Sequence, residues 1–199
     1  MTVRARAFCN DADITAEADG MDRRHNAGYG ADLAPYRAAN CVDRGAALAF
    51  YFGHHEHLLA NKLVGHVPPE AVLRDWFVDN KTRLPCGYVT MDGFQNGMDA
   101  YVDLVETLLP EQMFDVLICH RVLEHVLDDH GALKELFRIL KPGGLLNISV
   151  PQNFAFAETV DWNVPDPDIQ DHVRMYGTDF LDQLAEAGFK VTEERWLFS

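Results

Sequence analysis

The chain has 199 residues, of which 31 are acidic and 17 basic, and its formal net charge is -14. Hydrophobic residues make up 48% of the sequence, a share typical of folded globular proteins and too high for a disordered chain. Phosphate backbones and anionic lipid surfaces attract clustered Lys and Arg, so this acidity argues against nucleic acids and membranes as partners. At about 150 residues per domain, the length predicts a single main domain.

The cysteines and apolar runs indicate the compartment. Cys9, Cys41, Cys86 and Cys119 stand far apart, without the C-x-x-C spacing of zinc ribbons and thioredoxin-like proteins. No run approaches the roughly 18 apolar residues of a membrane-spanning helix. The first residues also lack the apolar stretch of a secretory signal. We therefore expect a cytoplasmic protein.

The first 60 residues differ in pattern from the rest of the chain. Residues 1 to about 30 show no periodic apolar face, which predicts a loosely packed arm. From about residue 33 to residue 59 the apolar spacing becomes helical, with Gly45 and Gly53 as expected interruptions.

From residue 61 onward, short apolar runs alternate with helical periods. The predicted strands cover residues 63–67, 87–91, 100–102, 114–119, 145–150 and 191–198. One predicted helix begins at Pro68-Pro69-Glu70. A second contains the apolar stripe Leu133, Leu136, Phe137 and Leu140 and ends at Lys141-Pro142-Gly143-Gly144. A third runs from a cap at Thr178 to Gly188. This alternation predicts an α/β fold with a doubly wound, mostly parallel sheet and helices on both faces.

Acidic and histidine residues follow the predicted strands, where ligands bind in such sheets. Asp92 and Asp103 follow consecutive strands, and His120 follows the next one. A carboxylate after the second strand can accept hydrogen bonds from ribose hydroxyls, and one after the third can accept from an adenine amino group. Each Asp is explained equally well as a turn or cap residue.

Three segments of the chain resemble class I S-adenosylmethionine-dependent methyltransferases. Residues 114–126 (FDVLICHRVLEHV) resemble the fourth-strand motif of that superfamily, and residues 135–144 (ELFRILKPGG) resemble the helix and turn after it. Residues 171–177 and 187–189 are similar to the stretch after the fifth strand. The resemblance covers roughly residues 62–198, and it implies a Rossmann-like sheet and the small-molecule, methyltransferase type 11-like branch.

The resemblance also implies a cofactor and its binding residues. The cofactor would be S-adenosyl-L-methionine, with S-adenosyl-L-homocysteine as product. Asp92 would bind its ribose, Asp103 would approach its adenine, and His120 would line the methionine side. The backbone around Gly65 and His66 would receive the methionine moiety.

The residues before the first predicted strand lie where this superfamily often places a lid over the substrate. We expect residues 1–60 to form an N-terminal arm and helical lid, and residues 61–199 to form the cofactor-binding domain. Phe50, Tyr51 and Phe52 would then face the substrate, with core packing as the simpler expectation.

The loop after the first strand departs from the superfamily pattern. The usual D-x-G-x-G-x-G loop is replaced by VGHVPPE at residues 64–70, with one glycine and two prolines. Proline has no backbone N–H, so this loop offers fewer donors to a cofactor. Glu70 is expected to bind the cofactor or to favour the helix N-terminus through its charge.

Metal binding is not expected. Some quinone-pathway O-methyltransferases carry an E-x-x-E-H metal site, whose positions here are Arg121, Glu124 and His125. Arg in place of the first carboxylate argues against that metal. The His54-His55-Glu56-His57 segment lacks the H-E-x-x-H spacing and reads as a solvated helix end.

The end of the sheet is a third departure. The superfamily fold closes with an antiparallel hairpin, but only its first strand is predicted here. The last antiparallel strand is therefore expected to be missing, or replaced by another segment such as the N-terminal arm. An uncovered sheet edge invites pairing, so a homodimer through that edge is a further expectation.

Methyl transfer mainly requires alignment of nucleophile, methyl carbon and sulfur, helped by a nearby base. His172 is the expected catalytic base, with His125 second; His125, Arg174 and Tyr176 are expected to bind the substrate. Packing or capping is the alternative for all four. The expected function is O- or N-methylation of a small-molecule acceptor. The alternative is a catalytically degenerate methyltransferase-fold protein that binds or scaffolds.

Overall fold

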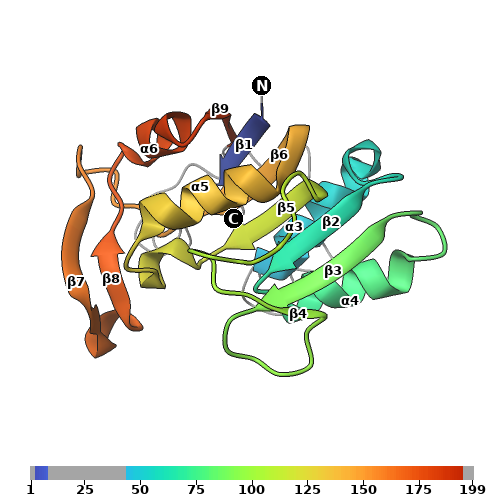
Figure 1. Cartoon of the computed structure of the whole chain (residues 1–199), viewed down its shortest axis with the longest axis horizontal. Helices are drawn as coiled ribbons and strands as arrows, with labels where there is room; N and C mark the ends of the chain where they lie inside the picture. The colour runs from blue at the N-terminus through green and yellow to red at the C-terminus, as the bar shows by residue number, and fades with distance from the viewer. Residues whose placement is uncertain (1–2, 9–43, 195–199) are drawn as a thin grey trace, which may run out of the picture.

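A computed structural model describes residues 3–8 and 44–194, which form a central sheet of seven strands in the order β4-β3-β2-β5-β6-β1-β9 (Figure 1). The strands are β1 (Val3–Phe8), β2 (Leu63–Val67), β3 (Gly87–Asp92), β4 (Ala100–Tyr101), β5 (Phe114–His120), β6 (Leu140–Ser149) and β9 (Phe189–Glu194). All described pairings in this sheet are parallel. The strand order reverses between β2 and β5, which confirms the predicted doubly wound α/β class.

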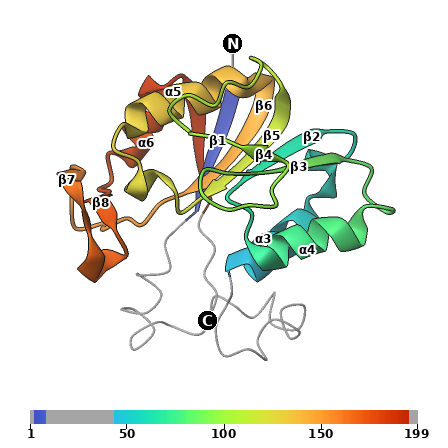
Figure 2. The same cartoon turned by 60° about the horizontal axis from the view of Figure 1, so that its bottom comes forward.

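Helices cover both faces of the sheet, as Figure 2 shows. The helices are α3 (Arg44–His54) and α4 (Ala71–Asn80) on one face, and α5 (Asp129–Ile139) and α6 (Phe180–Glu186) on the other. Short 3-10 turns are η2 (Glu56–Leu58), η3 (Leu123–His125) and η4 (Pro167–Ile169). Among the described helices, none is both long and apolar enough to cross a lipid bilayer.

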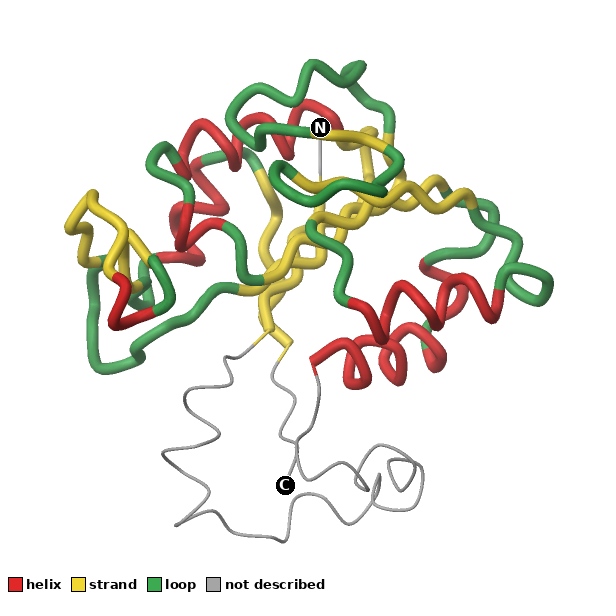
Figure 3. Tube along the Cα trace, turned by 90° about the horizontal axis from the view of Figure 1, so that it is seen from below, coloured by secondary structure: helices red, strands yellow, loops and turns green. Residues whose placement is uncertain are grey.

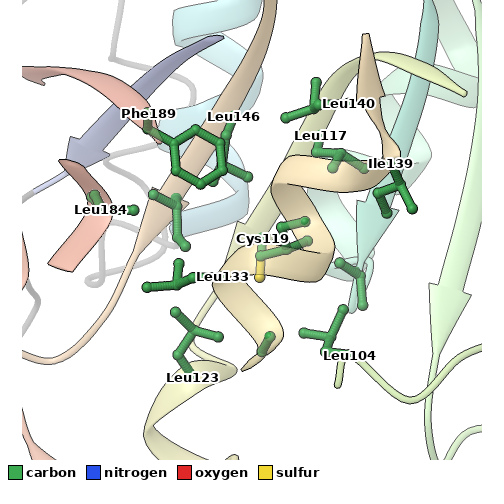
Figure 4. Close-up of a cluster of buried hydrophobic side chains, with 14 of the residues drawn as sticks. Leu104, Leu117, Cys119, Leu123, Leu133, Ile139, Leu140, Leu146, Leu184 and Phe189 are labelled. Atoms are coloured by element: carbon green, nitrogen blue, oxygen red, sulfur yellow. The ribbon is translucent and has the colours of Figure 1, made fainter. Parts of the chain in front are cut away.

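The larger core lies between α5, α6 and the sheet (Figure 4). Leu133 and Leu136 of the predicted stripe are buried against Leu117 of β5 and Leu146 of β6. Burial of one such leucine contributes about 1.5–3 kcal/mol relative to exposure. Asp128 starts the helix by accepting a 2.8 Å hydrogen bond from the Gly131 N–H. This core fixes α5 beside the carboxyl end of β5.

The N-terminal strand β1 fills the sheet between β6 and β9. Ala5 is paired with Leu146 on one side and Val191 on the other. The expectation of a loosely packed arm is therefore wrong for residues 3–8; residues 9–43 lie outside the described part of the chain. Two strands with unpaired backbone groups favour a strand inserted between them. Replacement of the last strand by an N-terminal segment is confirmed, and β1 runs parallel to both neighbours.

The closed position between β6 and β9 changes the argument for a homodimer. The uncovered edge that motivated it is occupied by β1. The homodimer stays a prediction. In the described part of the chain, β4 and β9 form the two outer edges of the central sheet.

The helix α3 packs in the core. Tyr51 and Phe52 are buried with Phe77 of α4 and Val64 of β2. The helices α3 and α4 therefore share one apolar cluster on the sheet, and the lid role and the domain boundary at residue 60 stay predictions. Core packing of the aromatic residues is confirmed, and Gly45 and Gly53 lie within or beside helical turns of α3 rather than interrupting it. The expected helical residues 33–43 lie outside the description.

Several element boundaries differ from those predicted. The strand β6 begins at Leu140, so the expected stop at residues 141–144 lies inside an irregular part of the strand, with Gly143 at φ 77°. Thr178 does not cap α6, since its hydroxyl donates to the Ala157 carbonyl at 3.4 Å. Gly188 ends that helix as expected, at φ 103°.

A two-stranded antiparallel hairpin, β7 (Val160–Asp166) and β8 (His172–Met175), was not expected from the sequence. It stands at one end of the molecule, outside the central strands (Figures 1 and 3). Pro165 within β7 fits a strand that is paired on one side only. The hairpin brings residues after the fifth predicted strand back toward the carboxyl end of β5.

The Glu135 carboxylate of α5 ties the segment after β4 to the helix. It accepts hydrogen bonds from the Thr107 N–H at 3.0 Å and hydroxyl at 2.6 Å, and from Arg138 at 2.7 Å. The bond from Arg138 and then those from Thr107 lower the pKa of Glu135 to about 2, against desolvation. A lowered folded-state pKa means that the stabilisation is full above the unfolded pKa of about 4.3 and is lost as the pH falls toward 2.

We predict that Glu135→Gln lowers the free energy of unfolding by about 1 kcal/mol at pH 7, because one charge-assisted network is weakened. The difference from the unchanged chain should shrink as the pH falls from 5 toward 2. Urea denaturation across that pH range measures it, with the exposed Glu106→Gln as matched control. A pH-independent difference would contradict this role of Glu135.

Candidate functional site

The carboxyl ends of β3 and β5 flank that of β2, and their last residues form the candidate cofactor side of the site. Asp92 ends β3 with 5% of its surface exposed. Its Oδ1 accepts hydrogen bonds from the N–H groups of Phe94 at 2.6 Å and Gln95 at 3.0 Å. These bonds orient the carboxylate, and Oδ2 accepts none from the described residues. Asp92 therefore holds its own turn and keeps one oxygen for a ligand.

Asp103 lies two residues beyond β4 and is exposed. Its Oδ1 accepts from the Val105 N–H at 2.9 Å, and its carbonyl accepts from the Glu106 N–H at 3.1 Å. The Val102 N–H donates to the Asp92 carbonyl at 3.1 Å, so the ends of these two segments lie side by side. The turn role of Asp103 is visible, and its contact with an adenine stays a prediction.

The loop after β2 holds a buried polar chain. His66 is fully buried; its Nε2 lies 2.6 Å from Glu70 Oε2 and its Nδ1 lies 2.7 Å from the Tyr88 hydroxyl. Burial and the charge of Glu70 raise the pKa of Tyr88, so its hydroxyl keeps the proton and donates to Nδ1. His66 then donates from Nε2 to Glu70. The Glu70 carboxylate is held by His66 and makes no capping bond to α4.

Gly65 and His120 occupy different surroundings. Gly65 lies inside β2, and a Cβ there would meet the side chains of Leu117 and Met91 at 2.8 Å, so these core side chains would have to shift to admit a larger residue. His120 ends β5, 1% exposed, with its Nδ1 2.7 Å from the Ser149 hydroxyl at the end of β6. His120 is thus at a strand end as expected, whereas Gly65 contributes packing and only its backbone is available to a ligand.

A second group of side chains gathers just beyond the end of β5. Glu124 and His125 lie in η3, and His172 begins β8. The rings of His125 and His172 have centroids 4.9 Å apart at an interplanar angle of 81°. Each of the three residues offers one ligand atom, and these atoms lie within 4.8 Å of one another. We call these three residues the histidine cluster; the sequence offered its histidines as separate candidates.

His172 is buried, with 5% of its surface exposed. Neither of its ring nitrogens has a hydrogen-bond partner among the described residues. Burial lowers the pKa of His172, and the charges of His125 and Arg121 lower it further, so the imidazole is neutral near pH 7. Glu124 is also fully buried, and its Oε1 lies 3.3 Å from Arg121 Nε. The cluster therefore combines a buried carboxylate with an imidazole that carries an available lone pair.

Arg174 makes its contacts within the protein, and its expected contact with the substrate stays a prediction. Arg174 is 2% exposed, and its guanidinium donates to the carbonyls of Leu123 at 2.9 Å and Leu127 at 2.9 Å, and to that of Val126. Its Nε donates to Asp161 on β7 at 2.6 Å. These donors are committed to the protein, so Arg174 fastens η3 to the hairpin.

Tyr176 is likewise engaged within the protein, and its expected contact with the substrate stays a prediction. It is fully buried, and its hydroxyl donates to Asp129 Oδ2 at 2.7 Å. Burial, and then the Asp129 charge, raise the pKa of Tyr176, which keeps the hydroxyl protonated. Tyr176 therefore attaches the segment after β8 to the first turn of α5.

Glu124 was not among the expected site residues. The E-x-x-E-H metal motif of some relatives includes the position of Glu124, but Arg121 at the first position of that motif argued against metal binding. One signal in the sequence pointed to this region: His172, Arg174 and Tyr176 alternate along one strand, so they share a face. That face lies against η3 and the start of α5.

The parallel sheet, with an acid ending β3 and polar residues beyond β5, defines a Rossmann-like domain of the class I methyltransferase type. The family profile described as "Methyltransferase domain" matches residues 25–194. The chain therefore belongs to the S-adenosylmethionine-dependent methyltransferase superfamily, class I, and S-adenosylmethionine is its cofactor.

Curated relatives match about half of the chain. A "Probable S-adenosylmethionine-dependent methyltransferase" of Mycolicibacterium smegmatis is 33% identical over 97 residues, or 48% of this chain and 36% of the relative. The cycloartenol-C-24-methyltransferase of Arabidopsis thaliana is 30% identical over 107 residues, or 47% of this chain and 30% of the relative. The matches thus span about a third of the length of these relatives.

A solved structure shows the same fold. The S-adenosylmethionine-dependent methyltransferase of Archaeoglobus fulgidus aligns with a TM-score of 0.51 and 14% sequence identity, over 82% of this chain and 75% of that one. At this identity the comparison supports the fold alone.

The residues at the strand ends fit this cofactor on the ribose side. Asp92 presents a buried, oriented carboxylate. A Cβ at position 93 would stand 2.9 Å from the Val102 carbonyl oxygen, so the turn after Asp92 requires glycine at Gly93. On the methionine side, Pro68 and Pro69 lack N–H donors.

We predict that Arg174→Lys lowers the free energy of unfolding by about 2–4 kcal/mol, because a lysine cannot serve three carbonyls and a carboxylate from one buried position. Chemical denaturation measures the change. The half-exposed Arg74→Lys is the matched control and should stay within about 0.5 kcal/mol of the unchanged chain. Equal stability of both variants would show that the guanidinium does not hold η3.

Proposed function

We propose that this protein transfers a methyl group from S-adenosylmethionine to an oxygen or nitrogen atom of a small-molecule acceptor. The observation that carries the proposal is the buried His172 imidazole, which has an available lone pair just beyond the carboxyl end of β5. The net charge of -14 favours a small molecule over a nucleic acid. The sterol methyltransferase among the relatives acts on another acceptor class within the same family.

In this proposal the strand ends divide the binding work. Asp92 binds the ribose hydroxyls with its remaining oxygen, Asp103 approaches the adenine amino group, and His120 lines the methionine side. The Glu70 carboxylate, held by His66, lies at the start of α4 beside the methionine moiety. When bound, the cofactor supplies the electrophilic methyl group.

His172 serves as the proton acceptor in this proposal. An acceptor hydroxyl loses its proton as its oxygen attacks, and an acceptor ammonium must lose one before its nitrogen can attack; a neutral imidazole takes that proton. Burial favours the neutral form, and the edge of His125 packs against the ring. His125 is exposed and is the group through which the acceptor would contact the cluster.

A second candidate is a methyltransferase-fold protein that binds the cofactor or a partner without turnover. The loop after β2 favours it, since two prolines remove donors and Glu70 is engaged by His66. The cytoplasmic location expected from the cysteine spacing applies to either candidate and stays a prediction.

Cofactor binding tests the site assignment first. We predict that Asp92→Asn weakens binding of S-adenosylmethionine at least about tenfold, because the amide keeps the Phe94 and Gln95 turn bonds but loses the charge. Isothermal titration calorimetry measures it, with the exposed Asp79→Asn as control. Binding unchanged in Asp92→Asn would overturn the ribose assignment. No binding of cofactor at millimolar concentration would overturn the enzyme proposal.

Turnover separates the two candidates. Labelled methyl groups from S-adenosylmethionine should appear in a small molecule when the protein is incubated with metabolite pools. We predict that His172→Asn lowers that rate about 100-fold and leaves cofactor affinity unchanged, because the proton acceptor is lost and the cofactor contacts remain. Cofactor binding without transfer into any pool would favour the non-catalytic candidate.

A further inference from the structure

We propose that Glu124, His125 and His172 form a binding site for one divalent transition-metal ion, with Zn²⁺ as the best-matched ion. The proposal concerns the cofactor-free protein and goes beyond the proposed function, in which His172 acts as a base. It rests on the geometry of the histidine cluster, on the unsatisfied ring of His172 and on the tautomer of His125.

The ligand atoms are already close to coordination distance. They lie within 4.8 Å of one another. Ligands of a tetrahedral zinc ion stand about 2.1 Å from the metal, and hence about 3.4 Å from each other. Metal binding would therefore require each pair of ligand atoms to approach by about 1.4 Å at most. The three residues come from two elements, η3 and β8, which Arg174 fastens together, so the site is built on a fixed frame.

His172 points to a ligand by itself. Only 5% of its surface is exposed, and neither ring nitrogen has a hydrogen-bond partner within residues 3–8 and 44–194. Burial of an imidazole without any partner costs free energy, which a protein normally recovers with a hydrogen bond or a metal. An ion between His172 and Glu124 would satisfy the ring and would also bind the buried carboxylate.

His125 has the tautomer that a metal ligand needs. Its Nδ1 lies 3.3 Å from the Asp171 carbonyl oxygen. Because a carbonyl only accepts, Nδ1 carries the proton and Nε2 keeps the lone pair. Metal-binding histidines commonly have the other ring nitrogen fixed in this way by a carbonyl.

The ligand set selects the class of ion. Two imidazoles and one carboxylate suit Zn²⁺ and similar borderline ions, whereas Mg²⁺ and Ca²⁺ prefer oxygen ligands. Three protein ligands also leave one coordination position open. The set differs from the carboxylate-rich E-x-x-E-H motif, because Arg121 occupies its first position and His172 joins from β8. At these positions the expectation of no metal rested on Arg121.

Arg121 limits the affinity of the site. Its Nε lies 3.3 Å from Glu124 Oε1 and places a cation beside the incoming dication. Its removal should therefore tighten metal binding. An ion on His172 would also occupy the lone pair needed for proton acceptance, so metal binding and the base role of His172 exclude each other.

The test is a titration of untagged, chelator-treated full chain with Zn²⁺ and, separately, with Mg²⁺, by calorimetry and without S-adenosylmethionine. We expect one Zn²⁺ per chain and at least about tenfold weaker binding in His125→Asn and His172→Asn. The exposed His57→Asn is the matched histidine control and should leave binding unchanged. Arg121→Met should bind at least about threefold more tightly.

Co²⁺ gives a second readout, since a tetrahedral nitrogen and oxygen site has strong visible absorption that His125→Asn should abolish. His125 is exposed, so its variant tests the site even if the buried His172 variant does not fold. No stoichiometric Zn²⁺ binding, equal affinity for Mg²⁺, or unchanged binding in His125→Asn would each overturn the proposal. Asp92→Asn should lose cofactor affinity and keep Zn²⁺, which separates failure of this site from failure of the proposed function.

Discussion

The guanidinium of Arg174 holds the hairpin β7–β8 against the turn that follows β5, and the candidate catalytic region depends on that attachment. It reaches the carbonyls of Leu123 and Leu127 across the interior and Asp161 within the hairpin. His172 stands two residues earlier on the same strand face, so it is directed at the same turn. The distance between His172 and the η3 residues is thus set by a buried ion network, which a neutral side chain could not reproduce.

The central sheet supplies the second requirement, a common edge for the carboxyl ends of its strands. β1 closes the gap between β6 and β9, which keeps the inner backbone groups of both strands paired. Because β1 runs parallel to its neighbours, its carboxyl end lies at the same edge of the sheet as the strand ends that carry Asp92 and His120. The N-terminal segment therefore completes the sheet, whereas segments far along the sequence form the site.

Much of the fold could be predicted because its signals are local. The strand at residues 114–120 is a continuous apolar run, and the stripe of α5 repeats with helical period, so both follow from periodicity alone. The strand β1 was missed although Val3–Phe8 alternates partly with the period of a strand, because the run is short and its partners near Leu146 and Val191 lie far along the chain. Asp92 was predicted as a strand-end acid from its position, whereas the histidine cluster joins residues 47 positions apart through tertiary contacts. From the sequence, Arg174 and Tyr176 were interpreted as polar site residues, because the sequence does not show their burial or their hydrogen-bond partners.

In the proposed arrangement, the cofactor lies across the ends of β2, β3 and β5, with its reactive end toward the histidine cluster. A crystal structure of this chain with S-adenosylhomocysteine tests that arrangement most directly. We expect the ribose hydroxyls on the Asp92 carboxylate and the sulfur at the side of the site formed by His120 and His172. A ribose bound away from Asp92, or a sulfur directed away from the histidine cluster, would contradict it.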